Sequence, residues 1–216
     1  MFDKSPTSFF RVPMDIAPSL AVVGLVGFMI GSIPTGVILS RTRYGLDVRE
    51  VGSGNIGATN ITRTFGWFAG ALTFFIDAIK GFFPLTLVVY LDKPQEWVLV
   101  GGAALVLGHC YSVFLRFRGG KGVATSFGCL LAVIPWGALI AGLVYGLVLA
   151  ITRISALGSL SGVVVLLVYP QFVSLPEQVA WLVYLISLIV IIRHRSNIHR
   201  LITEWMSSKE KRSKSE

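Results

Sequence analysis

Three short polar stretches carry the side chains in this sequence that are best suited to binding an anion. They read VGSGNIGATNITR at residues 51–63, GHCYSVFLRFRGGKGVAT at residues 108–125 and RHRSNIHR at residues 193–200. Glycines let main-chain N–H groups approach a ligand closely and turn inward together. Ser, Asn, Arg and Lys side chains add further donors. The combination predicts a phosphate site, although a plain connecting loop is the alternative for the first stretch taken alone.

These stretches offer many hydrogen-bond donors and few acceptors. The donor side chains are Ser53, Asn55, Asn60, Arg63, Lys121, His194 and Asn197, and the glycines expected to present N–H groups are Gly52, Gly54, Gly119 and Gly120. There is no nucleotide-binding fingerprint, no metal-ligand spacing of His, Cys, Asp and Glu, and no G-x-S-x-G turn. We therefore expect an anionic headgroup as ligand, without metal or cofactor, and a chemistry that rests on positioning and electrostatics.

Lys121 is the most distinctive of these candidates, because three glycines surround it within residues 119–122. A flexible backbone beside one lysine suits an anion. A positive-inside anchor explains Arg116 and Arg118 adequately. It does not explain the glycines around Lys121, so we predict that this lysine binds phosphate.

His194 is the candidate general base, since the unperturbed pKa of histidine is near 6.5. The alternative is a histidine that orders the third stretch by hydrogen bonding. His109 and His199 are weaker candidates. No histidine has an aspartate five positions later, so the H-x-x-x-x-D arrangement of the common glycerolipid acyltransferases is missing.

Composition places these stretches in a membrane protein. Of 216 residues, 54% are hydrophobic and 14% are charged, against about 25% charged in a soluble domain, and the mean hydropathy is +0.74. The net charge is +8, but the basic residues lie between and after the apolar runs, as expected for loops that face anionic lipid. No soluble domain is left to bind nucleic acid, and the two cysteines indicate no disulfide framework.

The apolar runs must position the polar stretches at one membrane face. They cover residues 20–39, 65–91, 97–115, 123–151, 154–169 and 179–192. The second and third stretches are both basic and should both be cytoplasmic, so an even number of crossings must separate them. Breaking residues 123–151 near Pro135 satisfies this parity. We predict an all-α polytopic membrane protein with about seven transmembrane helices, some short or broken, whose glycine-rich cytoplasmic loops form the active site; five spans is the alternative.

Two features inside the runs add detail. Pro34 should kink the end of the first span. Asp77 and Lys80 are three residues apart within the second run, so they share a helix face and should point inward. They either fix helix packing as a pair or line the site.

The expected organisation has three parts. Residues 1–19 form a periplasmic leader, residues 20–201 a single integral membrane domain, and residues 202–216 a charged, solvated or frayed cytoplasmic tail. Either span count puts the N-terminus outside and the C-terminus inside.

The motifs resemble those of the PlsY family, the bacterial acyl-phosphate:glycerol-3-phosphate acyltransferases. GSIPTG at residues 31–36, GSGNIGATN at 52–60, GH…RGGKGVAT at 108–125 and RHRSNI at 193–198 occur in the order of the family's motifs. The resemblance covers about residues 20–201. It implies a seven-span fold in the bacterial inner membrane with a cytoplasmic active site.

The resemblance also implies an activity. A fatty acyl group would pass from acyl phosphate to the 1-hydroxyl of glycerol 3-phosphate, giving lysophosphatidate and inorganic phosphate, the first step of phospholipid synthesis. Ser53, Arg63, Lys121 and Asn197 would hold phosphate, and His194 and Asn197 would serve catalysis. The two substrates and the bilayer are the expected partners, with no obligate protein partner. Acyl phosphate already has a good leaving group. A substrate phosphate oxygen can therefore accept the proton of the glycerol hydroxyl in place of a protein base.

Two other classes of function compete with this interpretation. A transporter for an organic phosphate would use the same basic, glycine-rich loops, but its polar residues should gather at the midplane. A non-catalytic membrane scaffold leaves three donor-rich stretches on one side unexplained.

Overall fold

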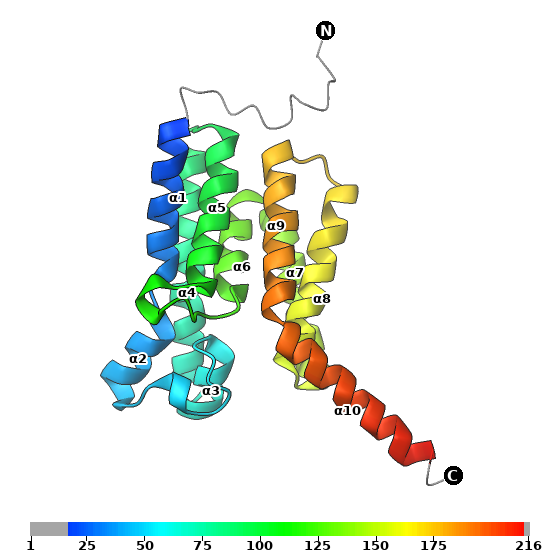
Figure 1. Cartoon of the computed structure of the whole chain (residues 1–216). Coiled ribbons are helices and arrows are strands. Elements are labelled where there is room, and N and C mark those ends of the chain that lie inside the picture. The colour runs from blue at the N-terminus through cyan, green and yellow to red at the C-terminus, as the bar shows by residue number, and fades with distance from the viewer. Residues whose placement is uncertain (1–16, 214–216) are drawn as a thin grey trace.

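The structure is a computed structural model that describes residues 17–213, and helices are the only regular elements in that range. Most of the expected leader, residues 1–16, lies outside the described residues. The helices that run side by side in Figure 1 are α1 (Ala17–Ser32), α4 (Trp67–Tyr90), α5 (Gln95–Cys110), α6 (Val123–Val133), α7 (Pro135–Thr152), α8 (Ser155–Val168) and α9 (Glu177–Arg193). These helices match the predicted apolar runs, so the all-α polytopic fold is confirmed.

The number of spans stays a prediction. Within residues 17–213, the helical segments long and apolar enough to cross a bilayer are Ala17–Tyr44, Trp67–Tyr90, Gln95–Leu115 and Pro135–Thr152, with a fifth if α9 and the start of α10 count as one bent span. A straight span needs about 20 residues. α6 and α8 are shorter than that, and the expected total of seven depends on them.

Prolines break the helices where the sequence indicated. α1 ends at Ser32, and α2 (Thr35–Tyr44) begins after Pro34. α6 ends at Val133, and Pro135 is the first residue of α7. A proline ring clashes with the preceding turn and provides no N–H, so it is tolerated best in the first turn of a helix. The predicted division of residues 123–151 near Pro135 is therefore confirmed.

Glycines bring α4 and α6 into backbone contact. A Cβ atom built on Gly128 would lie 1.9 Å from the carbonyl oxygen of Ala78, and one on Gly81 would lie 2.3 Å from that of Thr125. Only hydrogen fits at such contacts, and close backbone approach is a main source of helix association in lipid.

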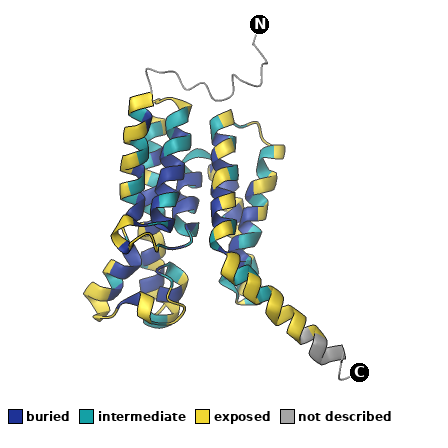
Figure 2. Ribbon diagram, viewed as in Figure 1, coloured by how far each residue is buried: buried dark blue, intermediate teal, exposed yellow. Residues whose placement is uncertain are grey.

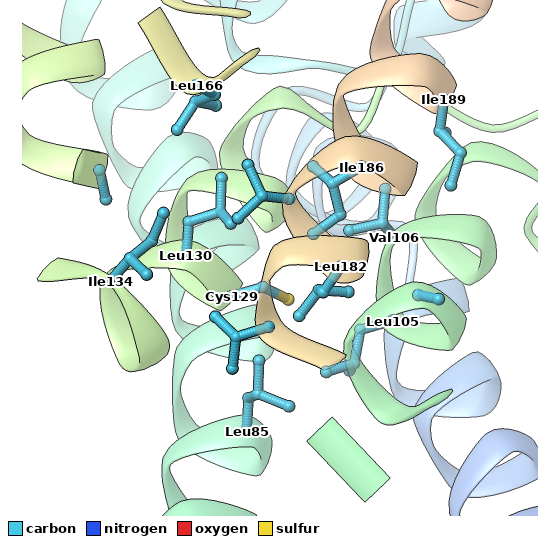
Figure 3. Close-up of a cluster of buried hydrophobic side chains, with 14 of the residues drawn as sticks. Leu85, Leu105, Val106, Cys129, Leu130, Ile134, Leu166, Leu182, Ile186 and Ile189 are labelled. Atoms are coloured by element: carbon cyan, nitrogen blue, oxygen red, sulfur yellow. The ribbon is translucent and has the colours of Figure 1, made fainter. Parts of the chain in front are cut away.

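A buried apolar core holds the centre of the bundle. Leu85, Leu105, Leu130, Leu182 and Ile186 interdigitate from α4, α5, α6 and α9 (Figure 3), and each is at most 1% exposed. Large apolar side chains also cover the outside, including Trp67 at 75% and Trp136 at 72% exposure. An apolar exterior around a packed interior is the pattern expected of helices in lipid.

A second, smaller core lies under the first polar stretch. It is formed by Val37, Val48, Ile56, Ile61, Ala69 and Leu115. These residues fix α2, the short 3-10 helix η2 (Val48–Glu50) and α3 (Ala58–Phe65) against one another. The loop of the first stretch is therefore supported by apolar packing at both ends.

The C-terminal segment was expected to be solvated or frayed, and the structure contradicts only the fraying. α10 (Arg195–Ser213) is a continuous helix that leaves the bundle at its lower end in Figure 1. It crosses the expected domain boundary at residue 202 without a break. Apolar residues at helical spacing, such as Ile198, Leu201 and Trp205, indicate this helix, but the many charged residues around them hid the pattern in the sequence.

Candidate active site

A cavity of about 430 Å³ opens where the three polar stretches meet. Its lining includes all seven donor side chains named from the sequence, Ser53, Asn55, Asn60, Arg63, Lys121, His194 and Asn197. The basic residues in its wall are Arg63, Lys121 and Arg200, and Asp77 is the one carboxylate among the described lining residues. Because Lys80 neutralises Asp77, the cavity favours an anion.

Asn60 shapes the first polar stretch. Its side-chain amide donates to the carbonyl oxygens of Val48 (3.2 Å) and Val51 (3.1 Å), and its Oδ1 accepts from the N–H of Ser53 at 2.8 Å. Asn60 is 3% exposed, so these bonds satisfy a buried amide. They turn the loop back on α3 and place Ser53 in the cavity wall.

Asp47 fixes the chain just before this loop. Its carboxylate accepts from the N–H of Arg49 at 2.9 Å and pairs with the guanidinium groups of Arg49 (2.6 Å) and Arg41 (2.7 Å). These hydrogen bonds hold the pKa of Asp47 well below its usual range. The charge of Asp47 is thus already compensated by two arginines.

The second and third stretches are bound directly to each other. The guanidinium of Arg193 donates to the carbonyl oxygens of Gly119 and Gly120, each at 3.0 Å, and lies 5.0 Å from the ring centre of Tyr111. Lys121 Nζ donates to Oδ1 of Asn197 at 2.5 Å. The loop that carries Lys121 is therefore held by residues from the end of α9 and the first turn of α10.

Lys121 is a cation without a carboxylate partner among the described residues. Burial lowers its pKa, and the positive charges of Arg200, Arg193 and Arg63 lower it further. Bringing these cations together is unfavourable unless an anion lies between them. This electrostatic frustration is the main physical indication that the cavity binds phosphate groups.

His194 is 2% exposed and lies in the cavity wall between α9 and α10. Its Nδ1 is 2.8 Å from the carbonyl oxygen of Val190, and because a carbonyl only accepts, Nδ1 carries the hydrogen. Burial lowers the pKa of His194, and Lys121 and Arg193 add to that effect against a raising effect of the Val190 carbonyl. The imidazole is therefore neutral near pH 7, and its Nε2 is an acceptor.

The inward-facing couple in α4 is confirmed and extends to a third residue. Lys80 Nζ lies 2.6 Å from Asp77 Oδ1 and donates to the carbonyl oxygen of Ile33 at 2.8 Å, next to the break before Pro34. His109 Nδ1 lies 3.7 Å from the same carboxylate oxygen. Since Asp77 and His109 also line the cavity, the two interpretations of the couple both apply: it fixes packing, and it forms the floor of the site.

The glycines play a different part from the expected one. Gly119 and Gly120 donate their N–H groups to the carbonyl oxygens of Cys110 (3.2 Å) and His109 (3.0 Å), and neither lines the cavity. Gly52 and Gly54 are likewise absent from its wall, and both have positive φ angles, of 61° and 69°. The N–H of Gly54 likewise donates to the carbonyl oxygen of Val51, at 3.1 Å. The expectation that Gly54, Gly119 and Gly120 present N–H groups to a ligand is therefore corrected, and Gly52 lies outside the cavity wall.

Sequence reasoning overlooked a polar group from the connection between α7 and α8. Ser155 Oγ lies 3.0 Å from Thr59 Oγ1 and 3.2 Å from the hydroxyl of Tyr145, and all three residues line the cavity. The parity argument had already put this connection at the same membrane face, so Ser155 could have been found from it. Arg200, one turn beyond Asn197, could have been found in the same way.

An apolar groove of about 60 Å³ adjoins the cavity and runs between α6, α7, α8 and α9. Its wall is formed mainly by apolar residues such as Leu130, Ala141, Leu166 and Ile186, and it shares Val123, Tyr145 and Ser159 with the cavity. A polar chamber that continues into an apolar groove suits a ligand with a charged head and a hydrocarbon chain.

Comparison with known proteins identifies the family of this chain. Residues 21–204 match the family model described as glycerol-3-phosphate acyltransferase. The chain belongs to the glycerol-3-phosphate acyltransferase family. Among curated members, the glycerol-3-phosphate acyltransferase of Myxococcus xanthus is 48% identical over 179 residues, which cover 82% of this chain and 93% of that protein. A Thermus thermophilus protein of the same name is 46% identical over 82% of this chain and 88% of its own length.

Solved structures of the acyltransferase family have the same fold. The crystal structure of PlsY (YgiH), an integral membrane glycerol 3-phosphate acyltransferase, in its glycerol 3-phosphate form is 37% identical, with a TM-score of 0.81 over 86% of this chain and 93% of that one. Its lysophosphatidic acid form has a TM-score of 0.80 at 36% identity, with the same coverage. This chain is accordingly an integral membrane acyltransferase-family protein.

Proposed function

We propose that the chain transfers a fatty acyl group from acyl phosphate to the 1-hydroxyl of glycerol 3-phosphate, releasing lysophosphatidate and inorganic phosphate. The observation that carries this proposal is the convergence of Arg63, Lys121 and Arg200 on one cavity beside an apolar groove. Both substrates bring a phosphate to the reacting centre, so a site for them needs several cations close together. The names of the relatives point to the same acceptor.

Phosphate binding is the role of the basic and amide side chains. Lys121 binds a phosphate as a point charge. Asn197 positions its ammonium, and Arg193 holds the loop that carries it through the carbonyl oxygen of Gly120. Arg63 can bind phosphate oxygens with two parallel hydrogen bonds. Ser53 and Asn55, held by the turn around Asn60, supply neutral donors. The first few carbons of the donor's acyl chain enter the small groove between α6, α7, α8 and α9.

The chemical step requires alignment more than activation. The glycerol 1-hydroxyl attacks the acyl carbon, a C–O bond forms, and the bond from that carbon to the phosphate oxygen breaks. Nε2 of neutral His194 accepts the hydroxyl proton and then passes it to the departing phosphate. Lys121 and Arg63 offset the negative charge that develops on the leaving group. Holding both substrates in one cavity supplies most of the acceleration.

The site lies on the cytoplasmic side in this proposal. The segments at the same end of the bundle as the cavity carry Arg41, Arg43, Arg116, Arg118 and Arg153. The opposite turns carry Asp92, Lys93, Glu96 and Glu177. By the positive-inside rule the cavity end faces the cytoplasm of the bacterial inner membrane and the N-terminus lies outside.

Donor selectivity tests the proposal. The purified protein in phospholipid vesicles is supplied with glycerol 3-phosphate and, in parallel, with acyl phosphate, acyl-coenzyme A or acyl carrier protein, and 1-acylglycerol 3-phosphate is measured by mass spectrometry. Acyl phosphate is the expected donor, because the motifs resemble those of the acyl-phosphate-dependent family and the sequence has no nucleotide-binding fingerprint for coenzyme A. Equal turnover with acyl-coenzyme A would count against the proposal.

A further inference from the structure

α10 has two faces of different chemistry. Ser196, Asn197 and Arg200 line the cavity. Apolar residues follow one another at short helical spacings, namely Ile198, Leu201, Ile202, Trp205 and Met206. With 3.6 residues per turn, these apolar positions fall within one arc, which adjoins Asn197 and is centred on the side opposite Arg200. One helix thus presents polar groups to the site and an apolar stripe to its surroundings.

The apolar stripe is exposed. Ile202 is 52%, Trp205 58% and Met206 60% accessible, and Figure 2 shows the coloured part of α10 extending from the bundle with most of its residues exposed. Contiguous exposed apolar surface rimmed by polar residues marks a protein or membrane interaction site. The stripe lies on the helix that follows directly from α9, with a bend of 57° between the two. Its first turn is therefore at the end of the bundle where the cavity opens.

Basic residues outnumber acidic ones in the sequence of this segment. Residues 195–216 contain Arg195, Arg200, Lys209, Lys211, Arg212 and Lys214 against Glu204, Glu210 and Glu216. Lys209 Nζ lies 4.3 Å from the ring centre of Trp205, so a cation is held directly over the apolar face. A lysine or arginine at the edge of an apolar helix face reaches lipid phosphates while its stem stays in the apolar layer.

We propose that α10 is an interfacial helix that docks its apolar face on the anionic lipid surface of the membrane. The charge favours anionic headgroups over a second copy of this chain, whose α10 would carry the same positive charge. The family match ends at residue 204, so Trp205, Met206 and Lys209 extend the docking face beyond the part shared with the family. Docking holds Asn197 and Arg200 at the cavity, which makes turnover depend on membrane charge.

Depth measurements test docking without reference to activity. A nitroxide label is placed on Ile202→Cys and, as the matched control on the opposite face, on Ser207→Cys in the full chain. The native Cys110 and Cys129 are fully buried, which leaves the introduced thiol as the reactive one. Power-saturation EPR in nanodiscs compares collision with oxygen, which concentrates in lipid, and with a water-soluble nickel complex. Phosphatidylglycerol and phosphatidylcholine nanodiscs supply anionic and neutral surfaces.

In phosphatidylglycerol, the Ile202 label should favour oxygen and the Ser207 label nickel, and the contrast should weaken in phosphatidylcholine. Lys209→Gln should lower the ratio of docked to undocked helix about fivefold, since one basic side chain at an anionic surface is worth about 1 kcal/mol. Equal nickel access at both sites in phosphatidylglycerol would overturn docking. Equal depth of the Ile202 label in both lipids would overturn the requirement for negative charge. If the label is instead protected from nickel in lipid-free micelles, and the protection increases with protein concentration, the face binds a second copy of the chain.

The link to turnover rests on the proposed function and is tested separately. Ile202→Glu and its control Ser207→Glu add the same charge on opposite faces. In phosphatidylglycerol vesicles, Ile202→Glu should lower kcat/KM several-fold at unchanged thermal stability, while Ser207→Glu should match wild type. If the labels at residues 202 and 207 differ in depth as expected but both glutamate variants are equally active, docking stands and its link to turnover is refuted. An inactive wild type would refute the proposed function alone.

Discussion

At the scale of single residues, the crowding of cations is what distinguishes this cavity from an ordinary polar interior. Lys121, Arg63 and Arg200 line one chamber, and the arginines add to the effect of burial in lowering the pKa of Lys121. The carboxylate of Asp77, which lines the cavity, is paired with Lys80, and that of Asp47 is paired with arginines outside the cavity. A bound phosphate removes this repulsion, so ligand binding and relief of electrostatic strain are the same event.

Lys121→Ala should remove a charge-assisted hydrogen bond to phosphate, worth about 1.5–3 kcal/mol. That corresponds to a fall of about 10- to 150-fold in kcat/KM if the loss is fully expressed in the transition state. Lys121→Arg should rescue only part of it, because a planar fork does not replace a point charge. Arg118→Ala is the control, since Arg118 is an exposed loop cation outside the cavity. Wild-type kinetics for Lys121→Ala with both substrates would mean that this lysine is only an anchor.

His194 predicts a specific pH dependence. Burial lowers its pKa below the usual 6.5, so the folded protein keeps the neutral, accepting form at neutral pH and loses it only as the pH falls through that depressed value. Protonation of His194 should therefore leave the kcat/KM of wild type unchanged above about pH 7 and should lower it in acid. His194→Asn should lower kcat about 100-fold, at the lower end of the range for a positioned base.

The second ionisation of a substrate phosphate, near pH 6, contributes to the same acid limb. The profile of His194→Asn supplies the correction, because it retains the substrate ionisation alone. Wild type should decline more steeply than the variant below about pH 6.5. Profiles that superimpose after scaling would show that the proton passes directly to a substrate phosphate oxygen.

At the scale of helices and loops, the sequence predicted where the elements lie better than how the loops use their atoms. Proline chemistry, a local rule, located the breaks at Pro34 and Pro135, and the parity of the basic loops independently required the second break. The hydrogen-bond partners of Gly119 and Gly120 are Cys110 and His109 from the preceding helix, and only the folded chain reveals that contact. The helix formed by residues 195–213 was also hidden, because charge masked its apolar periodicity.

Gly128→Ala tests the close contact between α4 and α6. A Cβ at this position would lie 1.9 Å from the carbonyl oxygen of Ala78, whereas a Cβ at Gly146 would meet nothing within 4 Å. Overpacking of this kind costs about 1–3 kcal/mol, so Gly128→Ala should lower Tm in detergent by several degrees. Gly146→Ala, the matched control in α7, should leave Tm unchanged or raise it through helix propensity. Equal Tm values for the two variants would mean that the helices are not in contact.

At the scale of the whole molecule, the arrangement puts every polar stretch at one end of an apolar bundle. This differs from the midplane site expected of a transporter. The convergence could be predicted from the sequence because basic flanks determine sidedness. The sidedness of Ser155 follows from the same rule, but its contact with Thr59 could not be predicted in that way, because it joins helices that are 96 residues apart in the chain.

Single cysteines test the orientation of the bundle. Cysteine introduced at Ser53 or Ser196, both at the cavity end, should react with a membrane-impermeant maleimide in inverted vesicles only. Cysteine at Gln95, in the opposite turn, should react in right-side-out vesicles only. Labelling of Ser53→Cys from the periplasmic side would contradict the cytoplasmic site.

The central claim is that both phosphate-bearing substrates react in the one cavity, and stoichiometric turnover tests it most directly. The purified chain in vesicles is given acyl phosphate with and without glycerol 3-phosphate, and inorganic phosphate and 1-acylglycerol 3-phosphate are measured in the same samples. We expect phosphate release that requires glycerol 3-phosphate and equals product formation mole for mole. Phosphate release that is independent of glycerol 3-phosphate, or uptake of glycerol 3-phosphate into vesicles without acylated product, would contradict the account.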